Sequence, residues 1–112
     1  MQAGRAVALL AVVALGCPAL AQDAPPGDPV VGRKLALRVC QGCHGANGIA
    51  KLPEAANLAG QDPDYLARQL AAFHSGERKN ETMNAVSQML NDKQMHDVAA
   101  YYGGIKIEVK SP

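Results

Sequence analysis

Apolar residues recur at helical spacing in three stretches of the chain, and each stretch opens with a side chain that can cap a helix. Asp and Asn accept hydrogen bonds from the free N–H groups at a helix start, and Pro fits the first helical position. The pattern therefore predicts three principal helices, over residues 28–40 from Asp28-Pro29, 62–74 from Asp62-Pro63, and 91–102 from Asn91.

Glycine and proline interrupt the chain between these stretches. Residues 44–61 are predicted to form a loop, and residues 77–82 a second, polar loop after Gly76. A short helix is expected over residues 84–90. Residues 105–109 alternate as a strand does, but no second strand pattern is available to pair with them. We therefore expect an all-α fold of about four helices.

The N-terminal 21 residues differ from the rest of the chain. A positive charge at Arg5 precedes the apolar run 6–16, and Ala19-Leu20-Ala21 has the form of a cleavage site. The run is shorter than the roughly 20 residues that span a bilayer. We predict a signal peptide over 1–21, with lipoprotein processing at Cys17 as the alternative. A flexible leader (22–27), one domain (28–104) and a tail (105–112) then follow.

The amino-acid composition limits the classes of function that this chain can have. The 112 residues are 48% hydrophobic and 19% charged, which is typical of one small globular domain. Removal of residues 1–21 leaves ten basic and ten acidic residues, so the mature chain is formally neutral. Nucleic-acid binding usually requires a basic patch, so we expect no such partner. The chain has no Trp and a single Phe, and a bound cofactor would supply apolar mass to this thin aromatic core.

The motif with the clearest chemistry is Cys40-Gln41-Gly42-Cys43-His44. This C-x-x-C-H form is that of covalent haem attachment. Two thiols three positions apart near a helix end can add to the two vinyl groups of a porphyrin, and the following histidine can then reach the iron. The motif predicts one haem c per chain, attached through Cys40 and Cys43, with His44 as an iron ligand.

Other uses of two cysteines fit the sequence less well. A thioredoxin-like redox pair would be expected near a βαβ pattern, which the sequence lacks. Structural zinc needs further ligands, but His74 and His96 lie twenty-two residues apart. Iron–sulfur clusters usually take four thiolates, and only two remain after signal cleavage. An incidental C-x-x-C-H in a helical domain would give a colourless protein.

Beyond the motif, the chain resembles a class I bacterial c-type cytochrome of the small periplasmic monohaem kind over about residues 28–104. The resemblance rests on residues 40–45, 57–61, 65–70, 73–78, Met83 and 90–102. It implies a fold in which the helices wrap around one covalently attached haem, with the first and last helices crossing beside it. It also implies that a methionine from a downstream loop supplies the second axial ligand.

Three methionines compete for that role. Met83 follows the polar loop Asn80-Glu81-Thr82 and falls where the resemblance places the ligand. Met89 lies in the predicted short helix, and Met95 lies on the buried face of the last helix, where Met is usually core filling. We predict Met83 as the ligand and keep Met89 as the alternative.

Residues around the predicted haem site have roles that the motif itself does not define. An axial histidine usually donates its second N–H to a backbone carbonyl. Similar proteins often have a proline about a dozen residues after the histidine for this, whereas this chain has Ala56 there and Pro53 three residues earlier. Arg78 is predicted either to reach a haem propionate or to remain a solvated charge. Tyr65 and Phe73 are predicted to line the haem pocket, and His74 and His96 to be solvated.

With both axial positions filled, the iron can exchange an electron but cannot bind a substrate. The sequence therefore predicts a periplasmic one-electron carrier and not an enzyme, whose partners are a dehydrogenase, an oxidase or a reductase. After signal cleavage no membrane span is expected. Two alternatives stay open, a haem c subunit of a periplasmic dehydrogenase complex and an open-iron haem enzyme or gas sensor.

Overall fold

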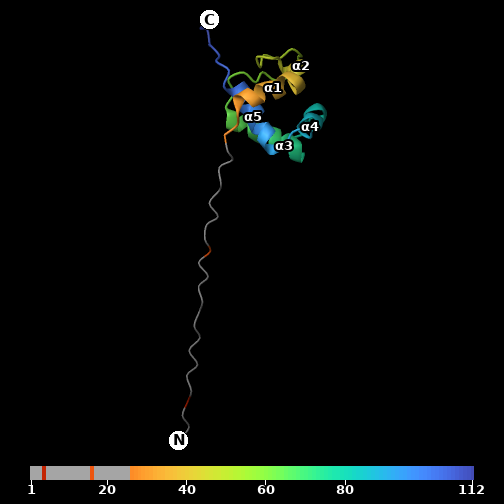
Figure 1. Cartoon of the computed structure of the whole chain (residues 1–112), viewed down its shortest axis with the longest axis vertical. Coiled ribbons are helices and arrows are strands. Elements are labelled where there is room, and N and C mark those ends of the chain that lie inside the picture. Colours follow the sequence, from red (N-terminus) through yellow and green to blue (C-terminus); the bar gives the residue numbers. More distant parts are fainter. Residues whose placement is uncertain (1–3, 5–15, 17–25) are drawn as a thin grey trace.

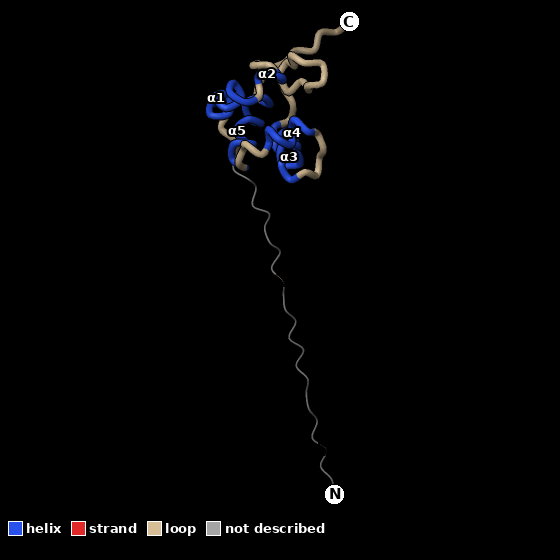
Figure 2. Tube along the Cα trace, turned by 90° about the vertical axis from the view of Figure 1, so that its right-hand side faces the viewer, coloured by secondary structure: helices blue, strands red, loops and turns tan. Residues whose placement is uncertain are grey.

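The computed structural model describes residues 4, 16 and 26–112, and within them five helices form and no strand does (Figure 2). The predicted all-α class is therefore confirmed for the described residues. The predicted signal peptide lies outside them, apart from Gly4 and Gly16. The helices are α1 (Pro29–Val39), α2 (Gln41–His44), α3 (Pro63–Ser75), α4 (Glu81–Ser87) and α5 (Asp92–Gly103).

Local capping explains where the three long helices begin. The Asp28 carboxylate accepts hydrogen bonds from the N–H groups of Val30 and Val31, and Asp62 accepts one from Tyr65. Asn91 and Gln94 exchange hydrogen bonds in a capping box at the start of α5. Each interaction spans two or three residues, which is why the sequence located these helix starts to within one residue.

The core forms where α5 packs against both α1 and α3 (Figure 1). At the crossing of α1 and α5, Gly32 is buried, and a Cβ atom there would overlap the backbone carbonyl of Asp97. The absence of a side chain thus permits the two backbones to approach closely. Tyr102, Ala36 and Ala99 are each no more than 1% exposed, so the first and last helices share one apolar interior.

Two boundaries differ from the prediction. Helical structure does not end at Gly42. Cys40 is the C-cap residue of α1 and also the N-cap residue of α2, so α2 follows α1 directly. The short helix α4 covers Glu81–Ser87 and not residues 84–90, because the Asn80 side chain accepts a hydrogen bond from the Met83 N–H and starts the helix earlier. As a result Met83 lies in the first turn of a helix and not after a loop.

The C-terminal tail leaves the domain after α5 (Figure 1). Residues 105–109 form no strand, and Val109 is 91% exposed, whereas Ile105 packs against the core cluster. None of the helices in the described part of the chain has the length and hydropathy to span a membrane.

Candidate functional site

A cavity of about 520 Å³ lies between the C-x-x-C-H motif and helices α3, α4 and α5. We call it the cysteine cavity. Cys40, Cys43, His44 and Met83 all line it, although they come from two segments about 40 residues apart in the chain. Much of the remaining wall is apolar, and includes Leu58, Leu66, Leu70, Phe73, Val86 and Leu90.

Helix α2 orients the motif. The His44 N–H donates to the Cys40 carbonyl oxygen at 3.0 Å, so one helical turn spans the motif. Residues three and four positions apart share a helix face, which brings Cys40, Cys43 and His44 to the same side. Both thiols are free and half-buried. Burial raises the pKa of Cys40 to about 11, which keeps it a neutral thiol, whereas a redox-active cysteine needs a lowered pKa.

The His44 ring is fixed by a single backbone carbonyl. Its Nδ1 atom lies 2.7 Å from the carbonyl oxygen of Ala56. Because a carbonyl oxygen can only accept, Nδ1 carries the proton, and the lone pair of Nε2 is left for a metal. The sequence left this acceptor open between Ala56 and Pro53. The structure identifies it as Ala56, since a backbone carbonyl does not depend on the side chain.

Two tyrosines of α5 hold the loop that follows His44. The Tyr102 hydroxyl donates to the Gly45 carbonyl at 2.9 Å, and the Tyr101 hydroxyl donates to the carbonyl of Ala46. Tyr102 is fully buried, and burial raises its pKa well above the usual value. Sequence analysis did not identify this role for Tyr102. The available signal was a tyrosine on a buried face, whose hydroxyl must find a partner.

Met83 is half-buried in the first turn of α4. Its own N–H group donates to the Asn80 side-chain oxygen at 2.9 Å. Of Met83, Met89 and Met95, it is the one that lines the cysteine cavity.

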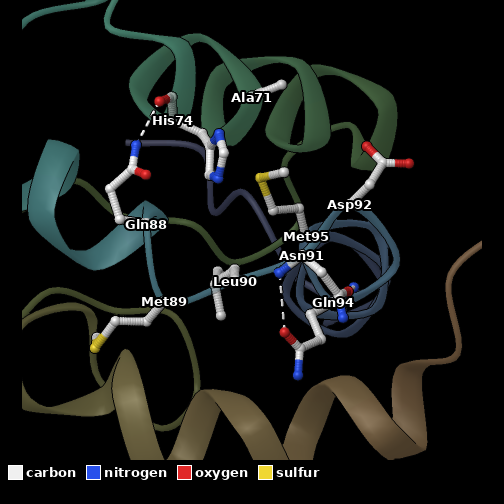
Figure 3. A pocket seen from close by; sticks show the side chains of 9 residues that line it. All are labelled: Ala71, His74, Gln88, Met89, Leu90, Asn91, Asp92, Gln94 and Met95. Atoms are coloured by element: carbon white, nitrogen blue, oxygen red, sulfur yellow. Dashed lines mark hydrogen bonds between the residues drawn. The ribbon is translucent and has the colours of Figure 1, made fainter.

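Met89 and Met95 instead line a separate hollow of about 730 Å³ between α3 and the start of α5 (Figure 3). In that view the Met95 side chain points toward His74, while Met89 extends away from both. Met95 is 5% exposed, as its predicted core position requires, and Met89 is 62% exposed. Neither cysteine, nor His44, nor Met83 lines this hollow.

Three residues that were predicted to lie near the haem also line the cysteine cavity. Tyr65 and Phe73 line the cysteine cavity, as predicted. Arg78 also lines it, with its guanidinium 4.6 Å from the centre of the Phe73 ring and hydrogen-bonded to Gln69.

The two histidines outside the motif differ from each other. His74 is exposed, as predicted. His96 is solvated only in part, because its side chain is 24% exposed and its Nε2 atom lies 4.0 Å from an Asp92 carboxylate oxygen.

The residues that line the cysteine cavity fit a c-type haem. Two free thiols, an imidazole with an available Nε2 and a thioether border one largely apolar cavity. In residues 26–112 no cluster of three or more His, Cys, Asp or Glu side chains could hold a metal ion. The described part of the chain therefore lacks the ligand set of a structural zinc or iron–sulfur site.

Comparison with known proteins agrees with this chemistry. The cytochrome c family model matches residues 30–103. Cytochrome c4 of Thiocapsa roseopersicina is 42% identical over 76 residues, which are 68% of this chain and 39% of that protein. Cytochrome c-554(548) of Halomonas halodenitrificans is 35% identical over 85 residues, 73% of this chain and 95% of that protein.

A solved structure, that of a thiosulfate dehydrogenase from Marichromatium purpuratum, is similar with a TM-score of 0.65 and 34% identity. The similarity covers 70% of this chain and 19% of that one. This chain thus spans well under half of the cytochrome c4 relative and of the thiosulfate dehydrogenase, but nearly the whole length of cytochrome c-554(548).

Proposed function

This chain belongs to the cytochrome c family, and we propose from that premise that it is a periplasmic one-electron carrier with a single covalently attached haem c. The observation that carries the proposal is the cysteine cavity, which gathers Cys40, Cys43, His44 and Met83 along one largely apolar wall. Haem iron, when bound, supplies a centre that changes its charge by one electron.

Each of the four residues has a separate role in this proposal. Cys40 and Cys43 would hold the haem covalently: each thiol would add across one vinyl C=C bond, with the sulfur bound to one carbon and the thiol hydrogen to the other. The Nε2 atom of His44 and the sulfur of Met83 would bind the haem iron. Both ligands are neutral, which favours ferrous iron and a positive reduction potential.

The rest of the cavity controls the environment of that centre. The Ala56 carbonyl fixes the His44 tautomer and raises the basicity of Nε2. Leucine, valine and phenylalanine side chains exclude water from most of the wall. With His44 and Met83 both bound to the iron, no position would be left for a substrate, which supports electron transfer without catalysis of a separate reaction.

The proposed count of one haem rests on the motif, and the proposed domain boundaries rest on the helices. The chain carries one C-x-x-C-H motif, and the described helices span residues 29–103. Its alignment with nearly all of cytochrome c-554(548) supports a single haem domain at 28–104. The predicted signal peptide at 1–21 supports export to the periplasm, where haem c is attached.

We further infer that the partner is a periplasmic oxidoreductase. The similarity to part of a thiosulfate dehydrogenase supports an enzyme that hands electrons to a domain of this kind. Redox partners of this type form small interfaces that release quickly. Copurification of a stoichiometric enzyme with this chain would instead favour the subunit alternative.

The optical spectrum of the mature protein, made in a periplasm with haem-attachment machinery, tests the proposal. Met83→Ala is compared with Met89→Ala, a matched control outside the cysteine cavity. We expect haem that survives acid–acetone extraction, no binding of carbon monoxide, and a weak sulfur-to-ferric-iron band that Met83→Ala removes and Met89→Ala retains. Ready binding of carbon monoxide by the wild type would favour an open-iron sensor or enzyme.

A further inference from the structure

Met83 lies in a segment with little hydrophobic support of its own. Helix α4 has seven residues, its one buried residue is Ser87, and it packs chiefly against α3. A helix of this length is not stable in isolation, because nucleation costs more than so few hydrogen bonds return. Another interaction must therefore hold α4 in the position that directs Met83 to the cysteine cavity.

The side-chain amide of Asn84 supplies this interaction. Its Nδ2 atom donates to the carbonyl oxygens of Phe73 at 2.7 Å and of Arg78 at 2.9 Å. Its Oδ1 atom accepts from the Asn80 N–H at 2.9 Å. Both N–H bonds and the carbonyl oxygen of the amide are thus in use, and the opposite orientation of the amide would place a donor against a donor.

These three hydrogen bonds tie together the end of α3, the connecting loop and the start of α4. Phe73 lies in the last turn of α3, and its carbonyl oxygen accepts from the Gly76 N–H at 3.2 Å as well as from Asn84. Asn80 in turn caps the Met83 N–H. The residue directly after Met83 therefore ties the helix that carries Met83 to α3 and to the connecting loop.

We propose that Asn84 is a positioning residue that keeps the Met83 sulfur available as an axial ligand. This inference rests on the proposed function, in which Met83 binds iron. Asn84 is not among the residues that line the cysteine cavity, so its effect reaches the iron through the backbone of Met83. Without the amide, α4 can move away from α3, and the Met83 ligand is lost while the rest of the fold remains.

The experiment measures the affinity of the ferric holoprotein for imidazole, which competes with Met83 for iron. Asn84→Asp has the same shape but no N–H donors, and Asn84→Ala removes the whole amide. Asn91→Ala is the matched control, because Asn91 caps α5 and makes no hydrogen bond to the Met83 segment. Global unfolding is followed in parallel by circular dichroism in the far ultraviolet.

We expect the Asn84 variants to bind imidazole about tenfold more tightly or more, a change equivalent to about 1.4 kcal/mol. Their sulfur-to-iron band should fade at temperatures below the unfolding transition. Asn91→Ala should unfold earlier yet bind imidazole as the wild type does.

Unchanged imidazole affinity in both Asn84 variants would overturn the inference, as would an equal increase in Asn91→Ala. Should Asn84→Ala not accumulate as holoprotein, Asn84→Asp decides alone. If neither variant accumulates, hydrogen exchange of the Met83 backbone amide in the wild type decides. Exchange as slow as that of the buried α5 amides would show that α4 does not open on its own, and would overturn the inference. A wild type without the sulfur-to-iron band would instead refute Met83 ligation itself, so the two failures are distinguishable.

Discussion

The two segments that bring ligands to the cysteine cavity are anchored in different ways. The loop after His44 is held by the hydroxyls of Tyr101 and Tyr102, which lie 55 and 57 residues later in the chain. The segment around Met83 is held by side-chain hydrogen bonds of Asn80 and Asn84 that span 3 to 11 residues. One segment is tied to the core and the other mainly to its own neighbours.

This difference predicts unequal local stability. Segments with few buried apolar contacts and exposed hydrogen bonds open at a lower free energy than the core does. The His44 loop should therefore open only when α5 separates from α1, whereas the Met83 segment can open alone. Substitutions at three positions test this comparison.

Tyr102→Ala should have the largest effect. It removes a fully buried side chain and the anchor of the Gly45 carbonyl, so we expect it to lower the free energy of unfolding by about 3–5 kcal/mol. Tyr102→Phe keeps the packing and should cost about 0.5–1.5 kcal/mol for one lost hydrogen bond, because the Gly45 carbonyl still accepts from the Gly48 N–H. Denaturant unfolding of the holoprotein measures both. A cost for Tyr102→Ala below 1 kcal/mol would refute the anchoring of the His44 loop in the core.

Asp97→Asn should have an intermediate effect at the α1 and α5 crossing. Burial by itself raises the pKa of Asp97, but hydrogen bonds from the Asp28 N–H and the Lys93 ammonium group, together with the Lys93 charge, hold it below its usual value. A lowered folded-state pKa means that the carboxylate stabilises the fold above about pH 4, where the unfolded group is ionised. This contribution is lost as the pH falls through the folded-state pKa.

We therefore expect Asp97→Asn to cost about 1–2 kcal/mol at neutral pH and to show less loss of stability in acid than the wild type. Unfolding by urea at a series of pH values measures this. The control is Glu108→Gln in the exposed tail, which should change neither quantity. Parallel pH curves for the wild type and Asp97→Asn would contradict the assignment.

Arg78→Ala should have the smallest effect, because Arg78 is an exposed residue of the loop that leads to the Met83 segment. The lost contact with the Phe73 ring predicts a cost of about 0.5–1 kcal/mol. The sulfur-to-iron band should persist, because the Arg78 backbone carbonyl still accepts from Asn84. Arg68→Ala on α3 serves as the control, since the Arg68 side chain is exposed and makes no hydrogen bond or ion pair with the described residues. A changed reduction potential would place the guanidinium at a haem propionate instead.

The sequence was most informative wherever an interaction spans a few residues. Asp28, Asp62 and Asn91 located the starts of three helices because a cap bonds to an N–H two or three positions later. The same reasoning failed at Asn80, whose cap begins α4 three residues before the predicted start. The polar composition of residues 77–82 concealed that helix, because its apolar content is too low to give a helical pattern.

The sequence by itself determined the helical class, the limits of the three long helices and the C-x-x-C-H chemistry, because each depends on spacing within one or two helical turns. Only the tertiary structure decided that Ala56 accepts from His44, that Met83 and not Met89 lines the cysteine cavity, and that Tyr101 and Tyr102 hold the loop after His44. These contacts join residues 12 to 57 positions apart. Their partners are set by how α5 packs against α1 and α3, and no local pattern of residues encodes that packing.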